Sequence, residues 1–541
     1  MKVFKKILIW VVLLATFATS CEHEEFFELT NPPEFPWLNI TEFERAAVSP
    51  YNYSFYSDWG GMFAMADRVV LDGMTDIIYH IPGSSANYPV VEVYSRQTNI
   101  NIDRTDGCFN AGYRAIGIIN AALDFYYEND EDPYPAATDF EKENNLKRIV
   151  GEMHFMRAFA YFHHTLRHCP APGDPAFETE EILPLRQAFT DAEAAINADF
   201  VTTQAIYEFI LEDLKTSVDL LPERYTEGVH HPSYQFGRIT KFGARAFLAR
   251  VLFRMGHWDE ALEHINYVID QNNGLFSLNQ EPIEAFNRSD ASRGNEVIWY
   301  ALYYDEEKGA SPNDFTLFTY LDYRAENGGH GENFRRSTWH TYSMANTMAI
   351  KLGWMDEELN ETPEALRDKR YQQLYHRLEG NRGNVTDDPD VYEQQYTNVT
   401  EPRIWNDKYF RAPKGQFSNV PVIRLAEMYL TRSIIRFKNG DLNGAAEDLN
   451  MIRKRAWDEE VAGTSYEESD QYITSANITE ETIELERLKE LSFEGDRLYY
   501  LQALEMPLPP GERTSVNEVS FPHTGIYFPI PQKEDDFRLE E

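Results

Sequence analysis

The chain has 541 residues and carries 89 Asp and Glu against 50 Lys and Arg, so its formal net charge is −39. A charge of this sign and size repels nucleic acid and anionic lipid head groups, which argues against both as ligands and leaves neutral and cationic ligands open. With 43% hydrophobic and 14% aromatic residues the chain can fill a sizeable core, and its length suggests about three domains or one large body built from repeats.

The N-terminal segment has the layout of a secretory signal peptide. Three lysines within the first six residues precede an apolar run from Ile7 to Thr19, and small residues occupy positions 18–20. An apolar helix of this length rises only about 20 Å, short of the roughly 30 Å hydrocarbon core of a bilayer. Cys21 directly follows the small residues, which resembles the lipobox of bacterial lipoproteins, whose cysteine is acylated and becomes the new N-terminus. We therefore predict a lipoprotein signal peptide over residues 1–20 and lipidation at Cys21; the alternative is an ordinary secreted protein with an incidental cysteine.

Residues 21–39 form an acidic stretch that contains Pro32, Pro33 and Pro36. Because proline restricts the residue before it to extended conformations, this stretch is predicted to be an extended tether. Loss of the three lysines of the leader would change the formal net charge from −39 to −42.

Helical periodicity dominates the rest of the chain. The stretch Leu146–His168 places apolar residues at spacings of three or four, as expected of an amphipathic helix, and Ala205–Leu221 and Lys241–Met255 show the same pattern. Helices are therefore predicted to carry the scaffold.

Two segments repeat one pattern, Ala244–Ile265 and Met428–Leu449. In each, a helix ends at a glycine (Gly256 or Gly440), a large apolar residue follows two positions later, and an alanine lies five positions after the glycine. Glycine suits the left-handed position that ends a helix, and alanine lets the next helix pack closely. The spacing is typical of tetratricopeptide-like hairpins stacked as a short solenoid, although a chance pair of hairpins is the alternative.

Aromatic residues concentrate in two loop-rich regions. One surrounds Asp72–Pro89, and the other is a long insertion over 274–407 in which Gly, Asn and Pro are frequent. A long loop-rich insertion in a helical frame is more often functional than filler. The aromatic residues of the two regions include Tyr56, Trp59, Tyr79, Tyr88, Trp299, Tyr300, Tyr303, Tyr304, Tyr320, Tyr323, Trp339, Tyr342 and Trp354.

Aromatic side chains on loops can bind sugars. The C–H face of a sugar ring packs on an aromatic ring, while its hydroxyls bond to Asn, Asp, Arg and Gln nearby. For any single aromatic residue, core packing is the alternative. The candidate ligand-binding residues are Trp59, Tyr79, Asn87, Trp299, Tyr303, Tyr320, Tyr323, Arg324 and Trp339.

Common catalytic motifs are missing from the sequence. It contains no GxSxG, no GxxxxGK, no complete GxGxxG and no HExxH. A pair of glycosidase carboxylates cannot be selected from 89 acidic residues by sequence alone, so a glycoside hydrolase is a disfavoured alternative to a protein without catalytic residues.

We predict neither a metal nor another cofactor. His164 and His168 have a spacing that could hold a metal, but no carboxylate lies between them, and packed histidines are the favoured interpretation. Asp387–Asp390 could touch a structural calcium ion but lacks the 12-residue loop pattern, which favours a solvated acidic loop. Cys108 and Cys169 are too few for a disulfide framework and are expected to be small buried residues.

Three C-terminal blocks, Arg424–Ala456, Glu484–Leu504 and Phe528–Glu534, resemble in order and spacing the blocks of the SusD/RagB family of Bacteroidota outer-membrane lipoproteins. The helix with Arg157 and Tyr161 resembles an N-terminal block of the same family. The resemblance implies a mainly α fold, SusD-like, with tetratricopeptide-like hairpin repeats and long loop-rich insertions. It also implies a cell-surface protein that is not an enzyme.

The resemblance further implies a lid over a SusC-like TonB-dependent transporter, to which captured oligosaccharides are delivered; a peptide-binding member is the alternative. The acidic run after Cys21 resembles the export signal of such lipoproteins, which predicts an outer-membrane anchor and a position facing the cell exterior. We expect an N-terminal region with helical repeats over 40–235 and a C-terminal region over 236–541 that includes the ligand-binding insertion 274–407.

Overall fold

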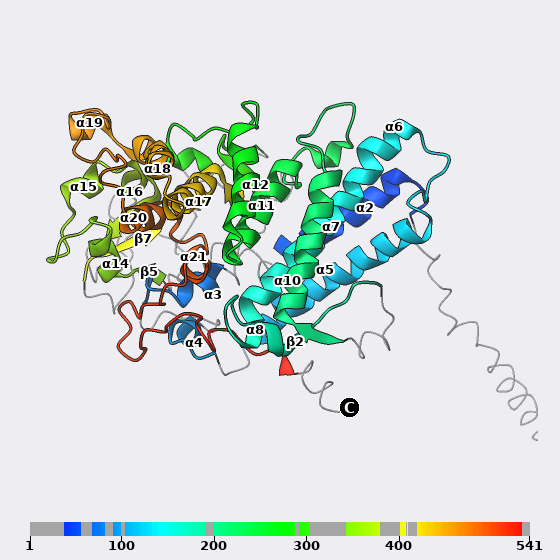
Figure 1. The fold of residues 1–541 in the computed structure, drawn as a ribbon, viewed down its shortest axis with the longest axis horizontal. Coiled ribbons are helices and arrows are strands. Elements are labelled where there is room, and N and C mark those ends of the chain that lie inside the picture. Colours follow the sequence, from blue (N-terminus) through cyan, green and yellow to red (C-terminus); the bar gives the residue numbers. More distant parts are fainter. Residues whose placement is uncertain are drawn as a thin grey trace, which may run out of the picture.

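A row of helices, each packed against the next and hereafter called the helix ladder, forms the main body of the molecule (Figure 1). The computed structural model describes residues 37–55, 68–81, 90–98, 103–189, 199–286, 292–302, 342–378, 401–406, 408 and 419–532. Along the ladder each helix packs against the next, which confirms the mainly α prediction. Its members are α2 (Ile40–Phe55), α5 (Asp103–Glu128), α7 (Lys147–His168), α10 (Thr203–Leu220), α11 (Lys241–Arg254), α12 (Trp258–Asp270), α17 (Leu425–Lys438), α18 (Leu442–Ala456) and α20 (Glu480–Leu491).

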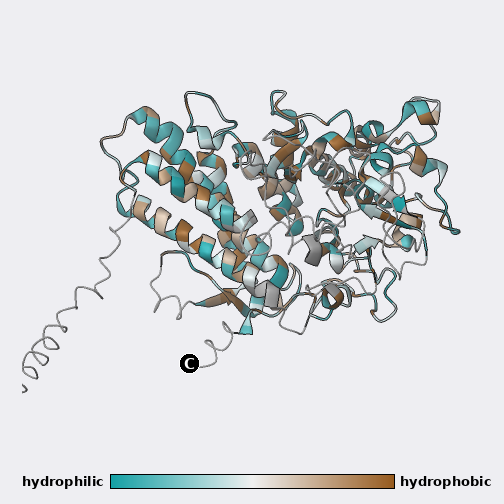
Figure 2. Ribbon diagram, turned by 180° about the vertical axis from the view of Figure 1, so that it is seen from behind, coloured by the Kyte–Doolittle hydropathy of each residue, from teal (hydrophilic) through white to brown (hydrophobic). Residues whose placement is uncertain are grey.

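Helix α7 lies at the centre of the N-terminal half. It packs against α2, α5 and α10, and every residue from Arg148 to His168 is buried. The predicted helix is therefore present, but it is enclosed on all sides rather than amphipathic. Figure 2 shows hydrophobic and hydrophilic residues mixed along the helices at the left of that view. Among the described helices, none combines the length and the apolar character needed to cross a bilayer.

Both predicted helical hairpins are present, as α11 with α12 and as α17 with α18. Gly256 and Gly440 end the first helix of each pair with φ of +77° and +84°, a conformation that costs glycine little. Ala261 and Ala445 are fully buried where the second helix packs against the first. Because α12 also packs against α17, the two hairpins are neighbours in space although the insertion separates them in sequence.

A strand within the predicted insertion pairs with a strand just after it. Strand β4 (Val297–Ala301) pairs antiparallel with β8 (Val420–Arg424), and β8 leads directly into α17. The described part of the insertion is richer in regular structure than the sequence predicts. It contains β5 (Tyr342–Met344), α14 (Asn346–Lys351), α15 (Pro363–Leu366), α16 (Lys369–Leu374), β6 (Tyr375–Leu378) and β7 (Arg403–Asn406).

Short pairs of strands complete the described structure. Strand β1 (Ile78–His80) pairs with β5, and β6 pairs with β7, which also packs beside β5. A separate pair, β2 (Glu181–Pro184) with β3 (Phe200–Thr202), lies at the N-terminal bundle. The short helices α3 (Arg68–Gly73) and α4 (Val90–Tyr94) flank β1, and α21 (Arg497–Ala503) packs on α3. Smaller elements are α6 (Asp139–Glu141), η3 (Lys142–Leu146), α8 (Ala176–Thr179), η4 (Pro232–Tyr234), η5 (Pro282–Ala285) and α19 (Glu459–Ala462).

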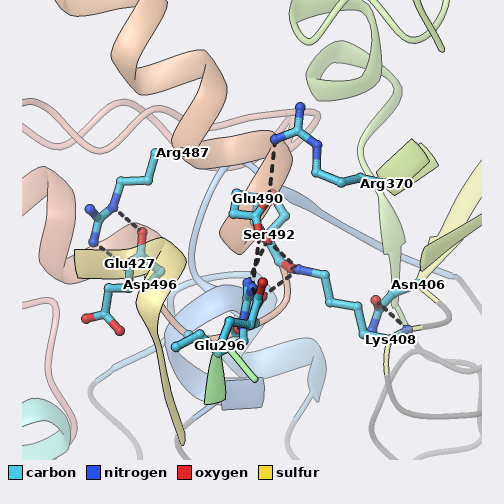
Figure 3. A network of polar contacts seen from close by, with 12 residues as sticks. Glu296, Arg370, Asn406, Lys408, Glu427, Arg487, Glu490, Ser492 and Asp496 are labelled. Carbon is cyan, nitrogen blue, oxygen red and sulfur yellow. Dashed lines mark hydrogen bonds and ion pairs between the residues drawn. The ribbon is translucent and has the colours of Figure 1, made fainter. Parts of the chain in front are cut away.

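A buried network of charges, which we call the Glu490 hub, joins α20 to the insertion (Figure 3). Glu490 accepts hydrogen bonds from Arg424 (2.8 Å) and Arg455 (2.5 Å), and Glu296 of the β4 segment bonds to the same two arginines. Burial alone would raise the pKa of Glu490, but Arg455, Arg424 and Arg370 outweigh it and hold this pKa well below its usual value. Lys408 donates to the carbonyls of Glu490 and Ser492. Its ammonium group thus places a positive charge at the C-terminal end of α20, where the helix dipole favours one.

The turn Glu494–Arg497 extends the hub toward β1. Arg487 forms a bidentate ion pair with Asp496, at 2.7 and 2.6 Å. Arg497 forms another with Asp76, which lies between α3 and β1, at 2.9 and 3.0 Å. The ion pairs around this turn therefore connect α20 and α21 to the segment between α3 and β1.

Candidate ligand-binding surface

Tyr79 is one of two predicted ligand-binding residues that the structure describes. It lies on β1 opposite Ser343 of β5, and its side chain is half-buried, whereas its neighbour Ile78 is fully buried. Successive residues of a strand point to opposite faces, so the buried Ile78 fixes the face on which Tyr79 lies. Tyr79 is thus a partly exposed residue on a strand that the core holds in register.

Arg403 of β7 stacks on the Tyr79 ring. The guanidinium carbon lies 3.4 Å from the ring centroid, and Arg403 is only 5% exposed. Tyr94 of α4 contacts Tyr79 edge-to-face, with centroids 6.4 Å apart and planes at 79°. A cation over an aromatic face is attracted by the ring quadrupole, and this attraction strengthens as the cation loses water. Arg403 and Tyr94 together hold the ring in one orientation.

Glu512 holds Arg403 in place. Its Oε2 accepts a hydrogen bond from an Arg403 Nη at 3.0 Å, and its Oε1 accepts from the backbone N–H of Thr347 in α14 at 3.1 Å. Glu401 also pairs with Arg403, at 3.5 Å, but its side chain is 57% exposed. Glu512 thus connects β7 to α14.

Two further arginines tie the Glu512 segment to the elements around β1. Arg513 donates to the carbonyls of Tyr94 and Thr75 at 2.5 and 2.7 Å, and its guanidinium lies 4.1 Å from the Tyr94 ring centroid. Arg96 donates to the carbonyls of Met74 (2.8 Å) and Asn517 (3.2 Å). Burial lowers the pKa of Arg96 to about 10, with a contribution from the neighbouring Arg513, so Arg96 stays charged at neutral pH.

His80 lies beside this cluster. Its ring centroid is 5.8 Å from that of Tyr94 and 6.2 Å from that of Tyr342. Burial lowers the pKa of His80, so the imidazole is neutral at pH 7. The cluster of Tyr79, His80, Tyr94, Arg403, Glu512 and Arg513 is hereafter called the Tyr79 surface.

Two stretches that carry other predicted residues are joined to the same strand pair. Residues 82–89, which include Asn87, follow β1 closely, and residues 303–341, which include Tyr303, Tyr320, Tyr323, Arg324 and Trp339, precede β5. These residues and Trp59 lie outside the described part of the chain, as do Cys21 and Asp387–Asp390. Their roles stay predictions.

The structure corrects the expectation for Trp299. Instead of lying on a loop, it is part of β4 and is 1% exposed. Its ring packs edge-on against Phe155 and Phe159, at 5.0 and 5.2 Å, and its Nε1 donates to the Gly237 carbonyl at 3.1 Å. Tyr300, Tyr342 and Trp354 are buried as well, so core packing accounts for these four aromatic residues.

The described residues include no group of three His, Cys, Asp or Glu side chains arranged to hold a metal. His164 packs between Tyr113 and Phe109, with centroids 4.7 and 5.1 Å away, and burial holds the pKa of His164 well below its usual value. This confirms the interpretation of His164 as a packed histidine. Cys108 and Cys169 are buried, as the sequence predicts.

The residues around Tyr79 come from segments that are far apart in the sequence. Tyr94, Arg403 and Glu512 carry no periodic or motif signal that would connect them to Tyr79. They are connected to Tyr79 only by contacts between distant segments of the folded chain. A single sequence does not reveal such contacts.

Comparison with known proteins gives matches to two families. Residues 71–253 match a SusD-like family described as starch-binding and associating with the outer membrane, and residues 264–502 match the SusD family. None of the curated proteins matches the chain by sequence.

Solved structures share the fold at low sequence identity. A SusD superfamily protein from Bacteroides thetaiotaomicron is 19% identical, with a TM-score of 0.69 over 92% of this chain and 98% of that one. Surface glycan-binding protein A from the same species, solved with laminarihexaose, is 16% identical, with a TM-score of 0.65 over 92% and 97%. A SusD superfamily protein from Bacteroides vulgatus is 20% identical, with a TM-score of 0.64 over 93% and 97%.

Proposed function

The chain belongs to the SusD/RagB family, and from this premise we propose that it captures oligosaccharides at the cell surface and delivers them to a SusC-like TonB-dependent transporter. The family is one of non-catalytic binding proteins, which removes the glycoside hydrolase alternative. Two family-level observations support the proposal: the matched description names starch binding at the outer membrane, and a relative of the same fold was solved with a bound glucan hexamer.

The observation that carries the proposal is the exposed part of Tyr79 on its rigid support. An aromatic ring that Arg403 and Tyr94 hold in one orientation offers an apolar platform to a sugar without first being ordered. We infer that Tyr79 contacts the glycan, together with the predicted residues of the stretches joined to β1 and β5.

The charge of the chain favours a neutral glycan. With a formal net charge of −39, the protein repels polyanions such as sulfated or uronate-rich chains. The arginines of the Tyr79 surface already have partners, since Arg403 pairs with Glu512 and Arg513 donates to backbone carbonyls. They are therefore poorly placed to bind a new anion.

The proposal includes a lipid anchor at Cys21 and exposure on the outer face of the outer membrane. It is supported by the residues around Cys21 and by the outer-membrane association in the family description. Replacing Glu22, Glu24 and Glu25 by Ala should leave the protein lipidated but facing the periplasm. Protease accessibility on intact cells measures this, and unchanged surface exposure would refute the export signal.

Binding to a panel of ligands tests the proposal. The full chain in detergent is titrated with neutral oligosaccharides, including laminarihexaose and maltohexaose, and with cationic peptides. We expect saturable binding of at least one oligosaccharide and weaker binding by Tyr79→Ala. Tyr472→Ala, at a partly exposed tyrosine between α19 and α20, is the matched control and should bind as the wild type does. If only the peptides bind, the ligand is a peptide and the glycan proposal is wrong.

A further inference from the structure

We propose that Glu512 is a positioning residue for ligand binding: by holding Arg403 against the ring of Tyr79, it fixes the orientation in which the ring meets a sugar. The inference rests on the proposed function, because it concerns the same surface. It adds a residue from the C-terminal segment that lies outside every predicted ligand-binding region.

The two carboxylate oxygens of Glu512 have separate tasks. Oε2 accepts from Arg403 of β7 at 3.0 Å, and Oε1 accepts from the Thr347 N–H in the first turn of α14 at 3.1 Å. The N–H groups of a helix's first turn have no partner within the helix, and Glu512 satisfies one of them. Glu512 therefore connects Arg403 to an element that begins directly after β5, the partner strand of Tyr79.

Glu512 is the stronger of the two acidic partners of Arg403. Its distance to the guanidinium is 3.0 Å and its side chain is 15% exposed, whereas Glu401 is 3.5 Å away and 57% exposed. Solvent and salt weaken the exposed pair more. Of the described residues, Glu512 should thus contribute most to keeping Arg403 over Tyr79.

The backbone that carries Glu512 is itself held firmly. The next residue, Arg513, donates to the carbonyls of Gly73, Thr75 and Tyr94. The preceding residue, Gly511, has φ +61°, and a Cβ added there would lie 3.0 Å from the Asp76 Cα. The segment thus lies in close backbone contact with the turn before β1, and the carboxylate of Glu512 projects from a fixed base.

The arrangement gives Glu512 an influence on ligand binding without requiring contact with the ligand. If Arg403 leaves the ring, Tyr79 loses the cation that covers one of its faces and can rotate. The ligand must then order the ring when it binds, which weakens binding.

A comparison of two charge-neutralising variants tests this inference. Glu512→Gln and Glu401→Gln each remove one negative charge next to Arg403. With the tightest-binding neutral oligosaccharide of the panel as probe, we expect Glu512→Gln to raise Kd roughly threefold to tenfold and Glu401→Gln to raise it less than about twofold. Calorimetry on the full chain measures both, and thermal unfolding checks that each variant is folded.

A double variant separates positioning from a general structural effect. In a Tyr79→Ala background, Glu512→Gln should change Kd no further, because its effect acts through the ring. An equal loss of affinity in both backgrounds, or wild-type affinity in Glu512→Gln alone, would overturn the inference while leaving the proposed function intact. If the wild-type chain binds no oligosaccharide of the panel, the proposed function itself is wrong.

Discussion

The Glu490 hub and the Tyr79 surface use the same chemistry for different ends. In both, arginines from one part of the chain meet carboxylates from another. In the hub all partners are buried, and the two arginines that bond to Glu490 also bond to Glu296. At the Tyr79 surface, Arg403 pairs with Glu512 and also covers an aromatic ring that stays partly exposed. Ion pairs thus connect buried elements in the first region and orient the ring that we propose as the sugar contact in the second.

Neutralising the hub should produce the largest loss of stability. Glu490→Gln removes the charge that compensates Arg424 and Arg455 in a buried site. We expect a loss of about 3–5 kcal/mol in the free energy of unfolding. Urea unfolding measures it, with Glu447→Gln on the exposed side of α18 as the control, which should change stability by less than about 0.5 kcal/mol. Equal stability of the two variants would show that the hub does not lock the fold.

Acid should weaken the same hub. Arginine partners outweigh burial and hold the pKa of Glu490 and of Asp76 below their usual values of 4.5 and 3.8. Each therefore contributes stability that is present above its unfolded-state pKa and is lost as pH falls through the lower folded-state pKa. We expect unfolding free energy to fall as pH drops below about 4.5, and Glu490→Gln to show a shallower fall. An identical pH dependence in both proteins would contradict this assignment.

Replacing Trp299 should lower the free energy of unfolding without weakening ligand binding. Trp299→Phe leaves a gap beside Phe155 and removes the hydrogen bond to Gly237, so we expect a loss of about 2 kcal/mol. Glycan affinity of the folded variant should equal that of the wild type. Weaker binding with unchanged stability would return Trp299 to the ligand-binding residues.

Substitutions of helix glycines outside the Glu490 hub and the Tyr79 surface should change stability less. Gly440→Ala forces a side chain into φ of +84° and should cost about 1 kcal/mol. Gly117→Ala, inside α5 with no atom within 4 Å of the added Cβ, should instead stabilise by roughly 0.5–1 kcal/mol. Thermal unfolding distinguishes the two, and a shift of the same sign in both would contradict the role of the left-handed turn.

The sequence predicts the scaffold well because its signals are local. Helix-ending glycines and buried alanines lie within a few residues of one another, so Gly256 and Ala261 identify a hairpin without knowledge of the rest of the chain. The candidate site depends on contacts across long stretches, and Tyr79 meets Arg403 and Glu512 only after folding. The prediction that Trp299 binds ligand was wrong because it rested on the composition of the region. An aromatic residue in a Gly-rich region can equally lie on a buried strand, as Trp299 does on β4.

The most direct test of the central claim is one calorimetric comparison of wild type and Tyr79→Ala, titrated in the full chain with the neutral oligosaccharide panel. We expect saturable binding by the wild type and a Kd roughly threefold to tenfold higher in Tyr79→Ala, the range expected for an aromatic stacking contact. Because Tyr79→Ala also removes the packing of a half-buried ring on Arg403 and Tyr94, thermal unfolding checks that the variant is folded. Equal affinity in the two proteins would contradict the account.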